Sequence, residues 1–383
     1  MSYGSSRFYY VNYTILRHCL QLTASQGSWR LWLMVTGFLP LYFFHQVLLL
    51  AMRLIDEVLY ADYKKVKITA PVFVIANPRS GTTYLQRLLS LEETHYTSMR
   101  LLDTLFPAVC FHKLIRVINK VDKRCGQPIA RLLAKLDQLC FGGWDEIHPM
   151  GFTKAEEDEN LFFLPMMSAG ICLLFPFVDK ITENHFLDEC PEATRQQMMN
   201  FYENCLQRFV YATGPTKTYL TKNVFSSGRI QTLLTRFPDA KVIYIARHPY
   251  EALPSFVSMF SAMYQVHSPQ LPFTAPAYRA WAEMGMVFYQ HCLALEETLP
   301  DDAFYSLTYE SLLRSPQETV IAIFHFFHWQ PTERFLQRLG QEQVRQANYQ
   351  SKHHYSLEKY GLQKAEINAK LRVVFAKYGW TME

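Results

Sequence analysis

The chain has 383 residues, of which 49% are hydrophobic and 19% are charged, and its formal net charge is +4. This composition excludes a disordered chain, which combines low hydrophobicity with high net charge. Charges also recur too often for a protein with many membrane spans. The small net charge argues against a nucleic-acid partner, but it suits anionic small molecules or lipids. The eight cysteines are scattered without CxxC pairs, so we expect no metal site.

The most unusual stretch near the start of the chain is Leu31–Met52, which contains no Asp, Glu, Lys or Arg. It is long enough to cross the hydrocarbon core, which takes roughly 20 apolar residues. Three interpretations remain open: a transmembrane helix, a monotopic or re-entrant anchor kinked at Pro40, and a buried hairpin in a soluble fold. Trp29, Trp32 and Tyr42 are typical of the membrane interface and favour membrane association.

From Pro71 onward the pattern changes to alternating strands and helices. Short apolar runs rich in β-branched residues predict buried strands, and helical spacing of apolar residues follows them. The predicted strands are Pro71–Ala76, Thr218–Lys222, Ala240–Ala246 and Phe304–Thr308, and the predicted helices are Ser80–Leu91, Ser227–Arg236 and Tyr309–Phe327. This alternation predicts an α/β fold, with a P-loop-like parallel sheet flanked by helices. Residues 104–215 lack strong strand signals and are predicted to form a helical insertion.

The loop after the first predicted strand has the composition of an anion-binding site. Residues 77–84 read NPRSGTTY and lead into the first predicted helix, whose N-terminal N–H groups attract anions. Gly81 lets the main chain curl closely around a ligand. Arg79 adds a charge that can bind two anionic oxygens at once, and Thr82 and Thr83 add hydroxyl donors.

The loop departs from the ATP-binding Walker A motif. In that register Ala76 replaces the first glycine and Thr82 replaces the lysine. A kinase needs this lysine and a magnesium ion because the phosphoryl group is densely charged. A sulfuryl group carries one negative charge, so its transfer needs less neutralisation and no obligatory metal. The departure therefore argues against a P-loop kinase and points to another transferred group.

The sequence NPRSGTTYL after PVFVIA resembles the 5′-phosphosulfate loop of sulfotransferases that use 3′-phosphoadenosine 5′-phosphosulfate (PAPS). A second segment, KVIYIARHPYEALPSFVS, resembles the part of that family that binds the 3′-phosphate through an arginine and a serine eight residues later. Here these are Arg247 and Ser255. The resemblance covers about Pro71 to Gly379 and includes a tail, HYSLEKYGL, that is similar to a broad subfamily common in bacteria. Some members of that subfamily also have an N-terminal hydrophobic region.

The resemblance implies a membrane-associating region at 1–68 and a sulfotransferase domain at 69–383, with PAPS as co-substrate and no metal. The implied donor-binding residues are Arg79, Ser80, Gly81, Thr82, Thr83, Tyr84, Arg247 and Ser255.

The residues expected to carry the chemistry are less sharply defined. Arg79 is expected to stabilise charge on the leaving 5′-phosphate, and Lys222 matches a lysine near the family's reaction centre. Cytosolic members have a catalytic histidine two residues after that lysine, where this chain has a valine. Three candidates for the general base therefore stay open, in the order His148, Glu157 and Asp103.

The apolar segments 161–167 and 173–177 favour a lipid, sterol-like or polyprenoid alcohol as acceptor if they line a pocket. The alternative is that they belong to the core. A membrane-resident acceptor agrees with the hydrophobic stretch near the start of the chain.

Two other functions remain as alternatives. A Golgi-type carbohydrate sulfotransferase would use Leu31–Met52 as its anchor, but the one N-glycosylation sequon, Asn12-Tyr13-Thr14, precedes that stretch. We therefore favour a catalytic domain that faces the cytoplasm. A non-catalytic nucleotide-binding relative is disfavoured because Arg79, Gly81, Arg247 and the hydroxyl residues are intact.

Overall fold

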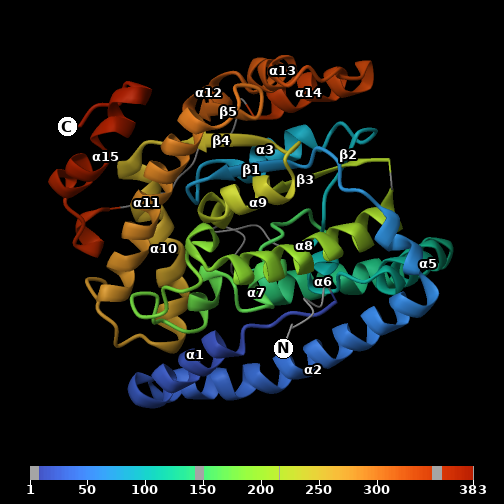
Figure 1. Cartoon of the computed structure of the whole chain (residues 1–383), viewed down its shortest axis with the longest axis horizontal. Coiled ribbons are helices and arrows are strands. Elements are labelled where there is room, and N and C mark those ends of the chain that lie inside the picture. Colours follow the sequence, from blue (N-terminus) through green and yellow to red (C-terminus); the bar gives the residue numbers. More distant parts are fainter. Residues whose placement is uncertain (1–7, 143–150, 215, 347–355, 383) are drawn as a thin grey trace.

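The computed structural model describes residues 8–142, 151–214, 216–346 and 356–382. Its centre is a five-stranded sheet with helices on both faces (Figure 1). All strand pairs are parallel and the order is β2-β3-β1-β4-β5. The strands are β1 (Val72–Ala76), β2 (Tyr96–Thr97), β3 (Thr218–Lys222), β4 (Lys241–Ala246) and β5 (Phe304–Thr308). The predicted α/β fold with a parallel sheet is confirmed.

The central strand β1 is buried along its whole length, which explains its uninterrupted apolar sequence. It pairs with β3 through Val74 and Lys222, and with β4 from Val72 to Ala76. Because all strands are parallel, their carboxyl ends meet at one edge of the sheet. Ligands of open α/β sheets bind outside this edge, so the pairing brings the loop after β1 beside the ends of β3 and β4.

Each face of the sheet has its own core, as the period-two alternation of a strand requires. Val72 and Val74 face a core shared with helices α3 (Thr82–Leu89), α13 (Pro316–Phe326) and α14 (Glu333–Gln346). Phe73 and Ile75 face the larger core. The helices that contribute to it include α8 (Glu192–Thr213), α9 (Ile230–Arg236), α10 (Pro249–His267), α11 (Pro276–Thr298) and α15 (Lys364–Tyr378).

Two details of the sheet region differ from the prediction. The helix predicted from Tyr309 to Phe327 is divided into α12 (Tyr309–Arg314) and α13, because Ser315 precedes a proline and leaves the helical conformation. The strand β2 was not predicted, since its two residues are too few to show a periodicity.

The chain between β2 and β3 is mostly helical in its first and last parts. It contains α4 (Leu101–Leu105), α5 (Val109–Arg124), α6 (Pro128–Phe141), α7 (Asn160–Phe163) and α8. The apolar segments 161–167 and 173–177 lie largely in the main core. Phe162, Met166 and Phe175 are completely buried there. This packing favours the core interpretation of both segments over the pocket interpretation.

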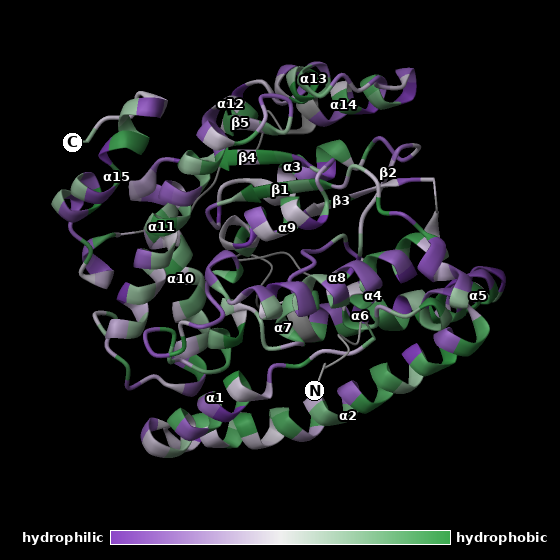
Figure 2. Ribbon diagram, in the orientation of Figure 1, coloured by the Kyte–Doolittle hydropathy of each residue, from purple (hydrophilic) through white to green (hydrophobic). Residues whose placement is uncertain are grey.

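The hydrophobic stretch near the start of the chain lies in α2 (Trp29–Leu59), which follows α1 (Tyr13–Gln26). The helix continues through Pro40, so the interpretation as a buried hairpin is wrong. Its length and composition would allow it to cross a membrane. However, one stripe packs against the protein, with Leu31, Val35 and Leu49 buried, while many of the other apolar side chains are exposed. Figure 2 shows that hydrophobic residues recur along most of this helix, which lies at the edge of the molecule in this view.

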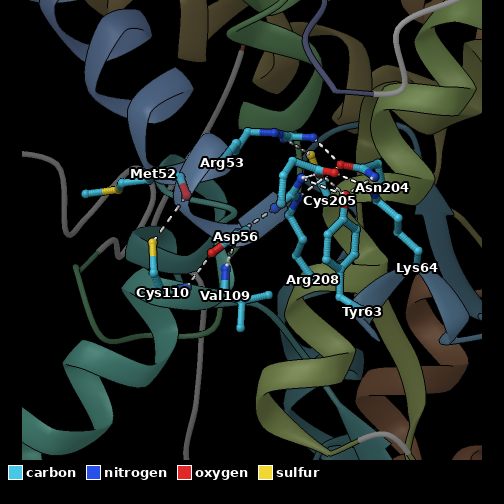
Figure 3. A network of polar contacts seen from close by, with 11 residues as sticks. Met52, Arg53, Asp56, Tyr63, Lys64, Val109, Cys110, Asn204, Cys205 and Arg208 are labelled. Carbon is cyan, nitrogen blue, oxygen red and sulfur yellow. Dashed lines mark hydrogen bonds and ion pairs between the residues drawn. The ribbon is translucent and has the colours of Figure 1, made fainter. Parts of the chain in front are cut away.

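The C-terminal part of α2 is joined to the protein by a buried polar network (Figure 3). The Asp56 carboxylate accepts a hydrogen bond from Arg208 of α8 at 2.6 Å. It also accepts the backbone N–H groups of Val109 and Cys110 at 2.7 and 2.8 Å, and so caps the first turn of α5. Arg53 donates to Asn204 and to the Cys205 sulfur of α8. Three helices far apart in the sequence are thus held together by charge-assisted bonds.

Candidate active site

The loop between β1 and α3 has a main-chain conformation suited to an anion. Arg79 has φ +68° and Gly81 has φ +85°, both in the left-handed region. At Gly81 a Cβ atom would lie 2.9 Å from Cδ2 of Tyr309, so a side chain is excluded by space as well as by conformation. The N-terminus of α3 begins directly after this turn. Its first N–H groups have no carbonyl partner within the helix and are therefore available to an anionic ligand.

Arg247, at the end of β4, joins the second predicted motif to this loop. Its Nη1 atom donates to the carbonyl oxygen of Arg79 at 2.6 Å, across 168 residues of sequence. Its guanidinium group lies 4.6 Å from the centre of the Tyr309 ring. The other nitrogens contact Glu251 Oε2 at 2.7 and 3.1 Å. The fold therefore brings the two predicted phosphate-binding motifs into direct contact.

Both serine hydroxyls that are predicted to bind the donor are buried without a hydrogen-bond partner among the described residues. These are Oγ of Ser80 in the loop and Oγ of Ser255 in α10, whose residues are 0% and 1% exposed. Buried hydroxyl groups are normally hydrogen-bonded, because an unsatisfied one costs roughly 1–3 kcal/mol. The two hydroxyls lie on the two motifs that the Arg247–Arg79 contact joins.

The other predicted loop residues differ in their surroundings. Thr82 is buried and Thr83 is half-buried, both in the first turn of α3. Tyr84 packs against the core on the α13–α14 face, and burial, with a smaller contribution from the Glu342 carboxylate, raises the pKa of its hydroxyl to about 12. That hydroxyl is buried and has no hydrogen-bond partner among the described residues.

Lys222 ends β3 at the same edge of the sheet. Its ammonium group is buried and lies 2.8 Å from Oε1 of Glu157 and 3.6 Å from Oε1 of Glu156. Lys222 and Glu157 were predicted as separate candidates, and the fold makes them a hydrogen-bonded pair. Val224, at the position of the family's histidine, is buried in a 3₁₀ turn, Val224–Gly228.

Residues 156–159 form an acidic run, and its last two carboxylates hold this edge of the sheet in place. Asp158 accepts hydrogen bonds from Tyr202 at 2.5 Å, Tyr219 at 3.1 Å and Asn223 at 2.8 Å. Burial raises the pKa of Asp158, although the bonds from Tyr202 and Asn223 oppose this shift. The next carboxylate, Glu159, pairs with Arg229 at 2.8 Å. Sequence reasoning missed Asn223 and Arg229, because nothing local to them indicates their partners.

Asp103, the third base candidate, lies in α4 and is 2% exposed. It accepts two hydrogen bonds from the Arg100 guanidinium at 2.9 and 3.1 Å, and lies 3.2 Å from Nδ1 of His112. Burial alone would raise the pKa of Asp103, but the hydrogen bonds from His112 and Arg100 lower it below its ordinary value. A carboxylate held ionised in this way is suited to positioning the chain. The first candidate, His148, lies outside the described residues.

Within the described ranges, no group of three or more His, Cys, Asp or Glu residues is arranged to hold a metal ion. The charges at the carboxyl edge are instead balanced by cationic side chains, since Lys222 and Arg229 pair with the acidic run.

Comparison with known proteins identifies the family of this chain. A model of the Sulfotransferase family matches residues 71–334, which include β1, the anion loop, Lys222 and Arg247. The chain belongs to this family. It is therefore a sulfotransferase, and the loop, the arginine and the lysine described above lie within the matched region.

Individual relatives come from mycobacteria. The omega-hydroxy-beta-dihydromenaquinone-9 sulfotransferase Stf3 of Mycobacterium tuberculosis is 25% identical over 284 residues, which cover 73% of this chain and 68% of Stf3. The sulfotransferase STF9 of Mycobacterium avium has a crystal structure with a TM-score of 0.70 at 16% identity, covering 97% of this chain and 98% of that one. STF1 of M. tuberculosis gives 0.60 at 20% identity, covering 86% and 84%. The two structures establish the similarity of fold.

Proposed function

We propose that this sulfotransferase transfers the sulfuryl group of PAPS to the hydroxyl of a hydrophobic acceptor. The observation that carries the proposal is the contact between the Arg79–Gly81 turn and Arg247. On the two motifs that this contact joins, the hydroxyls of Ser80 and Ser255 find no partner in the part of the chain that the structure describes. A PAPS molecule has a 5′-phosphosulfate and a 3′-phosphate, and therefore needs two anion sites held at a fixed separation.

The residues fit the donor in distinct roles. The α3 N-terminus, Ser80 and Arg79 would hold the 5′-phosphosulfate, and Arg247 with Ser255 would hold the 3′-phosphate. PAPS would supply an activated sulfuryl group. The oxygen of the acceptor hydroxyl would form a bond to its sulfur while the bond between that sulfur and the 5′-phosphate oxygen breaks. Fixed positive charge near the departing phosphate lowers the barrier because the negative charge grows there in the transition state.

Lys222 and Glu157 are the proposed catalytic pair. The Glu157 carboxylate would take the proton of the acceptor hydroxyl as the oxygen attacks sulfur. The buried Lys222 ammonium holds this carboxylate at 2.8 Å and can also reach toward charge that develops on the leaving side. Asp103 is assigned a positioning role, since Arg100 and His112 already bind it.

The acceptor class is inferred from similarity. Stf3, by its name, sulfates a hydroxylated menaquinone derivative, which is an apolar molecule. In this chain, the exposed apolar side of α2 would suit an acceptor that resides in a membrane. We propose a lipid or polyprenoid alcohol and a catalytic domain on the cytoplasmic side. The seven described cysteines are free, which agrees with a reducing compartment.

The direct test is incubation of the purified protein with isotopically labelled PAPS and a lipid extract, followed by mass spectrometry. We expect a labelled, sulfated lipid that forms without added metal. Calorimetry with 3′-phosphoadenosine 5′-phosphate separates donor binding from turnover. Binding of this nucleotide without transfer to any lipid, sterol or sugar alcohol would favour a non-catalytic relative, and transfer to carbohydrate alone would favour the Golgi-type alternative.

Replacement of Ser255 by alanine is expected to weaken donor binding about tenfold or more, because a hydrogen bond to a charged group contributes roughly 1.5–3 kcal/mol. The measurement is calorimetry with 3′-phosphoadenosine 5′-phosphate. Ser261→Ala is the matched control, since Ser261 is also a buried serine of α10 but is already bonded to the Ser258 carbonyl and Tyr360. Equal affinities of the two variants would remove Ser255 from the 3′-phosphate site.

The Glu251→Gln variant is expected to bind the donor about two- to fivefold more tightly. The Glu251 carboxylate pairs with the Arg247 guanidinium and competes with the proposed 3′-phosphate for it. This carboxylate is largely exposed, so its removal is worth only about 0.5–1 kcal/mol. The gain should shrink as salt is added, because salt screens exposed charges. Weaker binding by Glu251→Gln would show that the carboxylate instead holds Arg247 in its binding geometry.

A further inference from the structure

The hairpin formed by α5 and α6 has an apolar face that the described residues leave exposed. On α5 this face consists of Leu114, Val117 and Val121, which are 52–59% exposed. On α6 it consists of Ile129, Leu132, Leu136 and Leu139, and Leu139 reaches 82% exposure. In both helices these residues recur at intervals of three and four, so each set lies on one side of its helix. The described side chains of α6 include none that is buried.

The charges of the hairpin are almost all positive. Residues 109–141 contain seven Lys and Arg and two Asp, a net charge of +5, whereas the whole chain has +4. The carboxylates of both aspartates accept hydrogen bonds from backbone N–H groups of the protein. Asp122 accepts the N–H groups of Ile129 and Ala130 at the start of α6, and Asp137 accepts the N–H of Phe152. The exposed charges are therefore cationic; they are Arg116, Lys120, Lys123, Arg124, Arg131 and Lys135.

We propose that the α5–α6 hairpin docks this sulfotransferase on an anionic lipid bilayer. The two helices would lie in the plane of the interface with their apolar faces inserted. Lys120 and Arg124 flank the apolar stripe of α5, and Arg131 and Lys135 flank that of α6, where they can reach lipid phosphates. An apolar stripe bordered by Lys and Arg is the arrangement by which interfacial helices bind anionic membranes. Positive charge alone would suit several anions, but together with exposed leucines it selects a bilayer.

The hairpin is also hydrogen-bonded to the segment that leads to the proposed catalytic carboxylate. The Asp137 carboxylate accepts the N–H of Phe152 at 2.8 Å, and Phe152 lies five residues before Glu157 in the same segment. That segment runs beside α4. The Leu102 N–H donates to the Phe152 carbonyl, and Arg100 forms an isolated antiparallel β-bridge with Ala155. Docking through the hairpin would therefore place the bilayer near the segment that leads to the proposed catalytic carboxylate. The docking proposal itself requires neither the proposed donor nor the proposed acceptor.

The exposed side of α2 is a separate candidate for membrane contact, and it is tested alongside. Leu41, Phe44 and Val47 are 71%, 68% and 67% exposed on that helix. The polar network around Asp56 holds α2 against α5 and α8, so α2 leaves the protein surface only if buried ion pairs break. A role of α2 as a span would require that separation, whereas docking through α5 and α6 leaves the fold as described.

The experiment is sedimentation of the full-length protein with vesicles of phosphatidylcholine alone or mixed with phosphatidylglycerol, without nucleotide. Val117→Ser combined with Leu132→Ser and Leu139→Ser should lower binding to the mixed vesicles about tenfold or more. The charge variant, Lys120→Gln with Arg124→Gln and Lys135→Gln, should lose the preference for phosphatidylglycerol. The control is Val266→Ser with Val373→Ser, which changes two similarly exposed valines on α10 and α15, away from the hairpin (Figure 1). Circular dichroism checks that every variant is folded.

Three results would overturn the proposal. In the first, the hairpin variant binds the mixed vesicles as strongly as the parent protein does. In the second, only the α2 variant, Leu41→Ser with Phe44→Ser and Val47→Ser, loses binding. In the third, light scattering without lipid shows a dimer that the hairpin variant converts to a monomer, so that the face belongs to a second copy of the chain. Since donor binding and turnover are not measured here, failure of docking is distinguishable from failure of the proposed sulfuryl transfer.

Discussion

Replacement of Glu157 by glutamine is expected to lower the turnover number by about 10²–10⁴-fold, the usual contribution of a general base. The amide keeps the size of the side chain and can still accept a hydrogen bond from Lys222, but it cannot take the acceptor proton. Donor affinity should stay nearly constant, because the proposed donor contacts lie on the loop after β1, Arg247 and Ser255. The measurements are sulfated product formed per time and calorimetry with 3′-phosphoadenosine 5′-phosphate.

Glu156→Gln is the matched control for this prediction. Glu156 is the adjacent carboxylate and also faces Lys222, but at 3.6 Å rather than 2.8 Å. We expect it to retain most of the activity. If both variants lose activity equally, the two carboxylates act only by holding Lys222. If Glu157→Gln is fully active, the base lies elsewhere, and His148 becomes the next candidate.

The second large effect concerns stability. Asp56→Ala is expected to lower the free energy of unfolding by about 3–5 kcal/mol, the cost of breaking a buried ion pair by removing one partner. The substitution leaves the fully buried Arg208 without its closest carboxylate and removes the acceptor for the first N–H groups of α5. Urea unfolding followed by circular dichroism measures the change.

An exposed ion pair provides the comparison for Asp56→Ala. Asp62→Asn removes the carboxylate that pairs with Lys65, and both side chains of that pair are more than two-thirds exposed. Such exposed pairs contribute little to stability, because water and salt screen the two charges. The network would be energetically unimportant if Asp56→Ala cost no more than Asp62→Asn.

The centre of the sheet could be predicted because β1 and β4 are buried on both faces. PVFVIA and VIYIA are unbroken apolar runs, and β3 and β5 lie where they were expected. The strand β2 and the packing of α2 could not be predicted, because they depend on contacts between residues far apart in the sequence. The two residues of β2 form a strand only because Tyr96 and Thr97 pair with β3. For α2, the composition indicated that the helix prefers an apolar environment. It did not indicate that one side of the helix would pack against the core of the protein.

At the site, the residue types were predictable and several of their partners were not. A glycine, an arginine and hydroxyl residues between a strand and a helix indicate an anion loop, and the Tyr309 ring now explains why Gly81 has no side chain. Lys222 and Glu157 were each identified, but their pairing spans 65 residues and depends on how the segment before α7 folds over the end of β3. The same holds for Asp56 and Arg208, which are 152 residues apart.

The strand order has a consequence for biosynthesis. The central strand β1 ends at Ala76, but its two neighbours are β3 and β4, which end at Lys222 and Ala246. While the ribosome is still making the intervening segment, β1 has no strand to pair with, although α2 and the α5–α6 hairpin have already emerged. Long-range parallel pairing of this kind is slow and leaves apolar surface uncovered in the nascent chain. We therefore expect the growing polypeptide to bind chaperones before the proposed donor-binding site can form.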